Sequence, residues 1–98
     1  MKIIFSTQNY HYLKTKLLPL GDFEDGQTEV KFFPDGERYQ RILSDVNGKD
    51  VIIVGGTISD SDTLELYDLA CAIEKYGGKT LTLVIPYFGY STIERAFK

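Results

Sequence analysis

The sequence predicts an α/β fold built on a parallel sheet. The expected elements follow the order strand, helix, hairpin, strand, helix, strand, which is typical of this class. Residues 50–54 (DVIIV) form a continuous apolar, β-branched run, a pattern that indicates a strand buried on both faces. Residues 80–85 (TLTLVI) are expected to form a second buried strand. The helix between the two strands makes this pair a right-handed crossover.

The N-terminal segment is expected to contain one strand and one helix. Residues 2–6 (KIIFS) predict a short strand. Residues 9–18 (NYHYLKTKLL) predict a helix that Asn9 could cap. Pro19 and Gly21 end it. The apolar residues of the helix recur at helical spacing: Tyr10, Leu13 and Leu17.

A hairpin is predicted next, after a polar loop at residues 22–27. Residues 28–33 (TEVKFF) and 37–43 (ERYQRIL) are its two strands. Between them lies Pro34-Asp35-Gly36. Proline presets φ for a turn and glycine tolerates positive φ, so this segment is expected to turn tightly.

The second helix is predicted over residues 62–76. Asp62, Glu65 and Asp68 lie outside the apolar face of this helix. Asp62 with Glu65 three residues later resembles an acidic capping arrangement. Gly77-Gly78 ends it. The apolar stripe consists of Leu66, Leu69, Ala70 and Ile73.

Composition excludes several classes of function. The 98 residues carry a formal net charge of −3, which argues against a general nucleic-acid binder. Cys71 is the single cysteine, so no internal disulfide is possible, and its default role on the second helix is buried packing. His11 is expected on the surface of the first helix. No apolar run approaches the length of a membrane span, and we expect a cytoplasmic protein.

Two segments follow predicted parallel strands, at the edge of the sheet where ligands bind in α/β folds. Residues 55–62 (GGTISDSD) lack the lysine and the spacing of a phosphate-binding loop. They favour a simple strand-to-helix turn whose acids suit the helix dipole. Residues 86–95 begin with three aromatic residues around a glycine, which composition alone assigns to a core-capping loop.

A third candidate is the turn itself, residues 33–37 (FPDGE). It can project Phe33 as an aromatic platform, while ionised Asp35 and Glu37 only accept hydrogen bonds. Adenine offers a flat π face and an amino donor, so a ring beside a carboxylate is a sensible adenine contact. For the pattern alone, a hairpin turn with solvated acids is the favoured interpretation.

Three segments together resemble the ribose-phosphate pyrophosphokinase family. They are VKFFPDGE at residues 30–37, GKDV at residues 48–51 with its following strand, and IPYFGY at residues 85–90. The intervening helix also matches in length and character. The resemblance implies a phosphoribosyltransferase-like parallel sheet with flanking helices and a hairpin that carries FPDGE. It implies that residues 1–98 are an incomplete first domain, with the family's second domain absent.

The resemblance also implies an activity for the parent protein. Family members transfer the β,γ-diphosphoryl group of ATP to the 1-hydroxyl of ribose 5-phosphate, with Mg²⁺, as homo-oligomers. The FPDGE turn contacts adenine across a subunit interface, which assigns ATP binding to Phe33, Asp35 and Glu37. The family's metal-binding, ribose-phosphate and catalytic loops fall beyond residue 98, so no catalytic or metal-binding residue is expected here.

The sequence departs from the family after IPYFGY. The family usually continues with Ala-Arg-Gln-Asp-Arg, and its Arg-Gln pair contacts ATP. Here the run is Ser91-Thr92-Ile93-Glu94-Arg95, and neither Thr92 nor Ile93 can supply a guanidinium. This departure keeps open a non-catalytic regulatory paralogue that assembles with the enzyme. A third hypothesis, an unrelated α/β binding module with a chance FPDGE turn, is disfavoured by the three matches in order.

Overall fold

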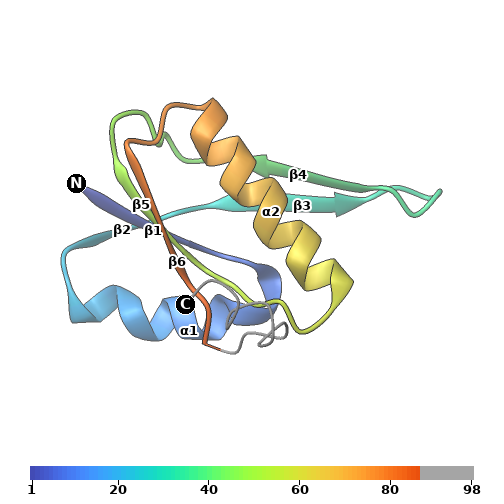
Figure 1. Cartoon of the computed structure of the whole chain (residues 1–98), viewed down its shortest axis with the longest axis horizontal. Coiled ribbons are helices and arrows are strands. Elements are labelled where there is room, and N and C mark those ends of the chain that lie inside the picture. Colours follow the sequence, from blue (N-terminus) through green and yellow to red (C-terminus); the bar gives the residue numbers. More distant parts are fainter. Residues whose placement is uncertain (87–98) are drawn as a thin grey trace, which may run out of the picture.

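The computed structural model describes residues 1–86, which fold as an α/β unit with two short 3₁₀ turns, at Gln8–Tyr10 and Leu18–Leu20. Figure 1 shows how the elements are arranged. The two helices are α1 (His11–Leu17) and α2 (Asp60–Lys75). The strands are β1 (Lys2–Ser6), β2 (Phe23–Asp25), β3 (Thr28–Phe32), β4 (Arg38–Ile42), β5 (Asp50–Val54) and β6 (Thr80–Val84).

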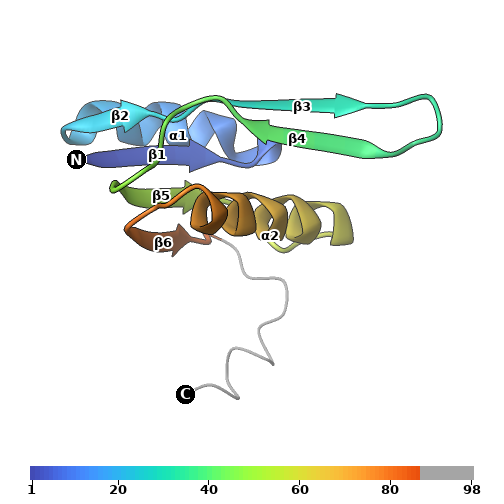
Figure 2. The same cartoon turned by 90° about the horizontal axis from the view of Figure 1, so that it is seen from above.

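Four of the strands form the predicted parallel sheet. Their order is β2-β1-β5-β6, and every neighbouring pair is parallel. Figure 2 shows the four strands in this order. The helices α1 and α2 provide the crossovers from β1 to β2 and from β5 to β6, because parallel neighbours cannot be joined by a tight turn.

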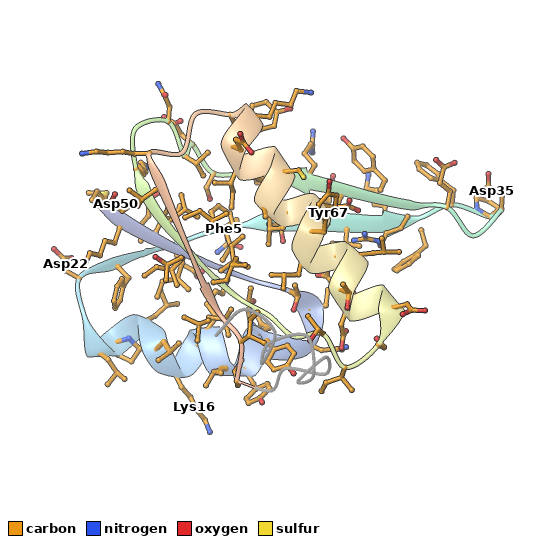
Figure 3. All side chains as sticks on the ribbon, in the orientation of Figure 1. Phe5, Lys16, Asp22, Asp35, Asp50 and Tyr67 are labelled. Atoms are coloured by element: carbon orange, nitrogen blue, oxygen red, sulfur yellow. The ribbon has the colours of Figure 1, made fainter. Side chains whose placement is uncertain are left out.

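The two faces of the sheet are buried under different helices, because successive side chains of a strand point to opposite faces. Ile3 and Phe5 of β1 face α2, whereas Ile4 faces α1. Phe5 lies at the centre of the molecule in Figure 3. The α2 side also buries Val46, Val51, Ile53, Leu66, Leu69 and Ile73, and the α1 side also buries Tyr10 and Val54.

The strand β2 corrects the predicted loop at residues 22–27. Phe23 packs against the α1 side of the core, and the three residues of the strand pair with β1. Gly26 follows at a close backbone approach, where its N–H donates to Ile4 O at 2.8 Å and an added Cβ would lie 2.7 Å from that oxygen. The strand looked like a loop because it is only three residues long, two of them are acidic, and it lies at the edge of the sheet.

The first helix begins later than predicted. A 3₁₀ turn occupies Gln8–Tyr10, and Tyr10 precedes α1 without a side-chain cap. Asn9 is therefore not a helix cap. Its amide Nδ2 instead donates to Asp62 Oδ1 at 2.7 Å, which links this turn to α2.

The second helix begins two residues earlier than predicted and is capped by Ser59. The hydroxyl of Ser59 accepts the N–H of Asp62 at 3.1 Å. Asp62 and Glu65, predicted to lie off the apolar stripe, are both buried. The expected capping role of this pair is wrong, because both carboxylates face the loop after β1.

Two burial predictions are wrong, one for β6 and one for Cys71. All five residues of β6 are exposed, although the apolar run predicted a buried strand. Within residues 1–86 only β5 pairs with β6, so its other edge is open. Cys71 is likewise exposed on α2 rather than packed inside. His11 is exposed as predicted.

The hairpin β3-β4 forms a two-stranded sheet of its own and projects from the molecule as an arm (Figures 1 and 2). Its base is fixed by Ile42, which packs against the core on the α2 side. Residues 31–37 are all exposed. Asp35 lies at the far end of the arm in Figure 3.

Candidate functional site

The tip of the arm is an ordered turn. Gly36 N–H donates to Phe33 O at 2.9 Å, and Phe33 N–H donates to Glu37 O at 2.8 Å. Gly36 has a φ of +88°, the conformation that the sequence predicted for it. Asp35 Oδ1 accepts the N–H of Glu37 at 3.0 Å. The turn therefore holds its three candidate residues in one local frame.

The aromatic platform of this turn is half exposed. Phe33 has 49% of its surface accessible, and its ring centroid lies 6.4 Å from that of Tyr39 at an interplanar angle of 59°. This tilted contact supports one side of the Phe33 ring and leaves part of the ring available to a ligand. Asp35 and Glu37 are exposed beside it. The structure thus leaves the three predicted residues exposed within one hydrogen-bonded turn.

A buried acidic pair at the start of α2 was missed by the sequence analysis. Glu65 Oε2 accepts the N–H of Gln8 at 2.8 Å, and Asp62 accepts the side chain of Asn9. Asp62 and Glu65 are three residues apart in the first two turns of α2, so they lie on the same side of the helix, and this spacing is the signal that could have paired them. These bonds hold the turn after β1 against α2.

Burial sets the electrostatics of this pair. Desolvation raises the pKa of Glu65, and the nearby Asp62 carboxylate raises it further, against the opposing effects of the Gln8 N–H and of Arg38. The pKa of Tyr10 is also raised, mainly by burial and also by Asp62 and Tyr12. An added Cβ on Gly56 would overlap the Tyr10 ring, so this glycine permits the close packing of the two segments.

A hollow of about 360 Å³ lies where β1 ends, between α1 and the base of the arm. Lys14 lies in its wall, but its ammonium group donates to Gly26 O at 3.0 Å and pairs with Asp25 at 2.8 Å. The charge of this lysine is therefore already compensated. The hollow is lined by Ser6, Thr7, Gln8, His11, Lys14, Gln27, Thr28 and Val30.

The structure describes residues 55–62, the first of the two segments that follow parallel strands, but only the first residue of the second, residues 86–95. Gly55, Gly56 and Thr57 are buried, and the segment leads into the Ser59-capped helix as the predicted strand-to-helix turn. In the aromatic segment 86–95, residues 87–95 lie outside the described residues. These residues include Thr92 and Ile93. Among residues 1–86, no three His, Cys, Asp or Glu side chains come together in a way that could hold a metal ion.

The arrangement of sheet, crossover helices and arm defines a fold class. The structure superposes on phosphoribosylpyrophosphate synthetase from Mycobacterium smegmatis with a TM-score of 0.82 at 17% identity, over 93% of this chain and 31% of that chain. It also matches a purine phosphoribosyltransferase from Pyrococcus horikoshii with a TM-score of 0.63 at 24% identity, over 89% of this chain and 60% of that one. The fold is phosphoribosyltransferase-like.

Sequence comparison then gives the family. The family described as the N-terminal domain of ribose phosphate pyrophosphokinase matches residues 2–98. The ribose-phosphate pyrophosphokinase of Fusobacterium nucleatum is 32% identical over 97 residues, which cover 97% of this chain and 31% of that protein. That of Thermoplasma acidophilum is 36% identical over 70 residues, which cover 71% of this chain and 24% of that protein. The chain belongs to this family.

The family resemblance is therefore confirmed, together with the fold class that it implied. The chain spans less than a third of the length of these curated relatives. The role of Phe33, Asp35 and Glu37 in ATP binding remains a prediction. No helix among residues 1–86 is long and apolar enough to cross a membrane.

Proposed function

We propose that the longer protein to which this chain belongs is a ribose-phosphate diphosphokinase. In this reaction the 1-hydroxyl oxygen of ribose 5-phosphate bonds to the β-phosphorus of ATP. The bond from that phosphorus to the oxygen bridging the α- and β-phosphates breaks, the hydroxyl proton is released, and AMP leaves. Membership of the pyrophosphokinase family supports this assignment.

The role of this chain in the reaction is to contact the adenine of ATP through the tip of the arm. The observation that carries this proposal is the ordered turn that holds a half-exposed Phe33 ring beside two exposed carboxylates. One carboxylate oxygen of Asp35, Oδ1, accepts a hydrogen bond within the turn. Its second oxygen can accept a hydrogen bond from the adenine amino group. The ring supplies stacking.

An arm that projects from its own domain suits a site shared with a neighbouring subunit. Residues 31–37 are exposed along their whole length, so the adenine contact would be completed by another copy of the protein. Homo-oligomeric assembly in the cytoplasm is part of this proposal.

The ring contact can be tested by Phe33→Ala in the assembled longer protein. Loss of one aromatic stack weakens binding by about 1–3 kcal/mol, by analogy with bases stacked on aromatic side chains. Calorimetry should therefore show ATP affinity reduced by about one order of magnitude or more. The matched control is Phe32→Ala, which removes the adjacent exposed ring on β3 and should leave the affinity unchanged. Equal affinities of wild type and Phe33→Ala would reject the role.

The 98-residue chain by itself is expected to have no diphosphokinase activity. Phosphoryl transfer depends on cations and metal ligands positioned around the phosphates. Magnesium would supply charge neutralisation in the longer protein, and residues 1–86 contain no cluster of His, Cys, Asp or Glu side chains able to hold it. Formation of phosphoribosyl pyrophosphate by the purified chain from ATP, Mg²⁺ and ribose 5-phosphate would contradict this expectation.

The second candidate function is a regulatory paralogue that lacks activity and assembles with the enzyme. Thr92 and Ile93, in place of the Arg-Gln pair typical of the family, favour it. An assay of the longer protein alone separates the two. Turnover by the purified protein supports the enzyme, whereas inactivity together with altered turnover of an added active pyrophosphokinase supports the paralogue.

A further inference from the structure

The arm is joined to the domain through contacts of β4 with the core and with α2. Ile42 anchors its base in the core. Nearer the tip, Arg38 is the first residue of β4 after the turn and is half-buried, whereas residues 31–37 are all exposed. Arg38 pairs with Phe32, and this is the pair of the β3-β4 ladder that lies nearest the tip.

The Arg38 side chain connects the arm to α2. One Nη donates to Asp68 Oδ2, and the other donates to Gln40 Oε1 at 2.9 Å. The Arg38 side chain is 18% exposed, and its partner on α2 is 52% exposed. Because a guanidinium is planar and its donors are fixed in direction, two bonds in different directions restrict it more than a single contact would.

Alternation along β4 explains why Arg38 faces the helix. Arg38, Gln40 and Ile42 lie half-buried on one face of the strand, whereas Tyr39 and Arg41 lie exposed on the other. Arg41 pairs with Glu29 at 3.0 Å, within the arm itself. One strand therefore carries two arginines with different effects: one joins the arm to the domain, and the other joins the two strands of the arm.

We propose that Arg38 and Asp68 are positioning residues for the adenine contact, through the ion pair that fixes the direction of the arm. The inference rests on the proposed function of the FPDGE turn. Since hydrogen bonds hold that turn as one unit, the orientation of β4 at Arg38 sets the orientation of Phe33, Asp35 and Glu37 relative to the domain.

The test uses the longer protein with two independent readouts. The first is the distance distribution between spin labels at Lys31→Cys on the arm and Glu74→Cys on α2, measured by double electron–electron resonance in a background without other cysteines. The second is ATP affinity by calorimetry in the unlabelled protein. The variants are Arg38→Gln and Asp68→Asn, with Arg41→Gln as the matched control.

Arg38→Gln and Asp68→Asn should each broaden the distance distribution and weaken ATP binding about two- to fivefold, the range expected for one partly exposed ion pair. Arg41→Gln should change neither readout. The exchanged pair Arg38→Asp with Asp68→Arg should narrow the distribution again and recover part of the affinity.

Two results would overturn the inference. In the first, Asp68→Asn leaves the distance distribution as narrow as in wild type. In the second, the distribution broadens and ATP affinity stays unchanged, while Phe33→Ala still weakens binding. Failure of the proposed function gives a different pattern, because Phe33→Ala itself then leaves the affinity unchanged.

Discussion

At the scale of single residues, Glu65 shows how burial and hydrogen bonding compete. The carboxylate accepts the Gln8 N–H, which favours its charged form, yet the pKa is raised because desolvation outweighs that bond. A buried ionised acid that is only partly compensated costs stability. The pair with Asp62 fixes the turn after β1 at this cost.

The raised pKa predicts a pH dependence with a definite sign. In the folded chain Glu65 binds its proton more tightly than in the unfolded chain, where the pKa is near its ordinary value of 4.5. The free energy of unfolding should therefore fall as the pH rises from about this value through the folded pKa. Glu65→Gln keeps an acceptor for Gln8 and removes the titration, so this fall should become smaller.

Urea unfolding of the chain between acidic and neutral pH measures this difference. Glu74→Gln is the matched control, because it removes an exposed glutamate from the same helix and should retain the wild-type pH dependence. Glu65→Gln should be at least as stable as wild type at neutral pH. Identical pH profiles for Glu65→Gln and wild type would contradict the argument.

At the scale of elements, the sequence predicted best where one local rule decides the structure. Pro34 and Gly36 predicted the turn of the arm. The continuous apolar run at residues 50–54 predicted that β5 is buried. The prediction failed at β6, because an apolar run does not reveal whether another segment covers it. It failed at Asp62 and Glu65 for a similar reason, since a helix pattern cannot show which loop will lie over its polar side.

The Ser59 cap was also missed, and it carries a testable consequence for α2. Ser59→Ala removes the acceptor for the Asp62 N–H and should lower the free energy of unfolding by about 1 kcal/mol. The control is Ser61→Ala, an exposed serine two residues further along the same helix, which should have a smaller effect. Urea denaturation of both variants measures this. Equal stability of Ser59→Ala and wild type would show that the cap contributes little.

For the candidate site, the sequence identified the tip of the arm but not its attachment. Phe33, Asp35 and Glu37 were predicted from one contiguous motif. The bond between Arg38 and Asp68 joins residues 30 positions apart, and its formation depends on how α2 lies beside β4. Pairings of this kind follow from tertiary packing, which a single sequence does not specify.

At the scale of the whole molecule, the β6 edge of the sheet is unpaired within residues 1–86. Leu81, Leu83 and Val84 of β6 are exposed, and only β5 pairs with this strand. Open strand edges with apolar side chains favour association between chains. We therefore expect the 98-residue chain to self-associate.

Sedimentation velocity over a range of concentrations checks this expectation. Leu83→Lys places a charge on β6 and should shift the distribution of sedimentation coefficients toward the monomer. Association of two chains through β6 would then bury an unpaired ammonium group. Tyr12→Lys is the control, because it introduces the same charge at an exposed aromatic residue of α1 rather than on β6. A monomer at high concentration for the wild-type chain would contradict the prediction.

The arm also has a consequence for how the chain reaches its folded state. The sheet must join β1 to β5, whose first paired residues are Lys2 and Asp50, so a long loop has to close before these strands contribute. The arm lies within that loop, and its ladder is entirely local, ending where Leu43 N–H donates to Gln27 O at 2.8 Å. A hairpin forms in about 1–10 μs. Once formed, it brings Gln27 and Leu43 together and shortens the segment that remains to be ordered, so the turn at the tip of the arm also affects the folding rate of the sheet.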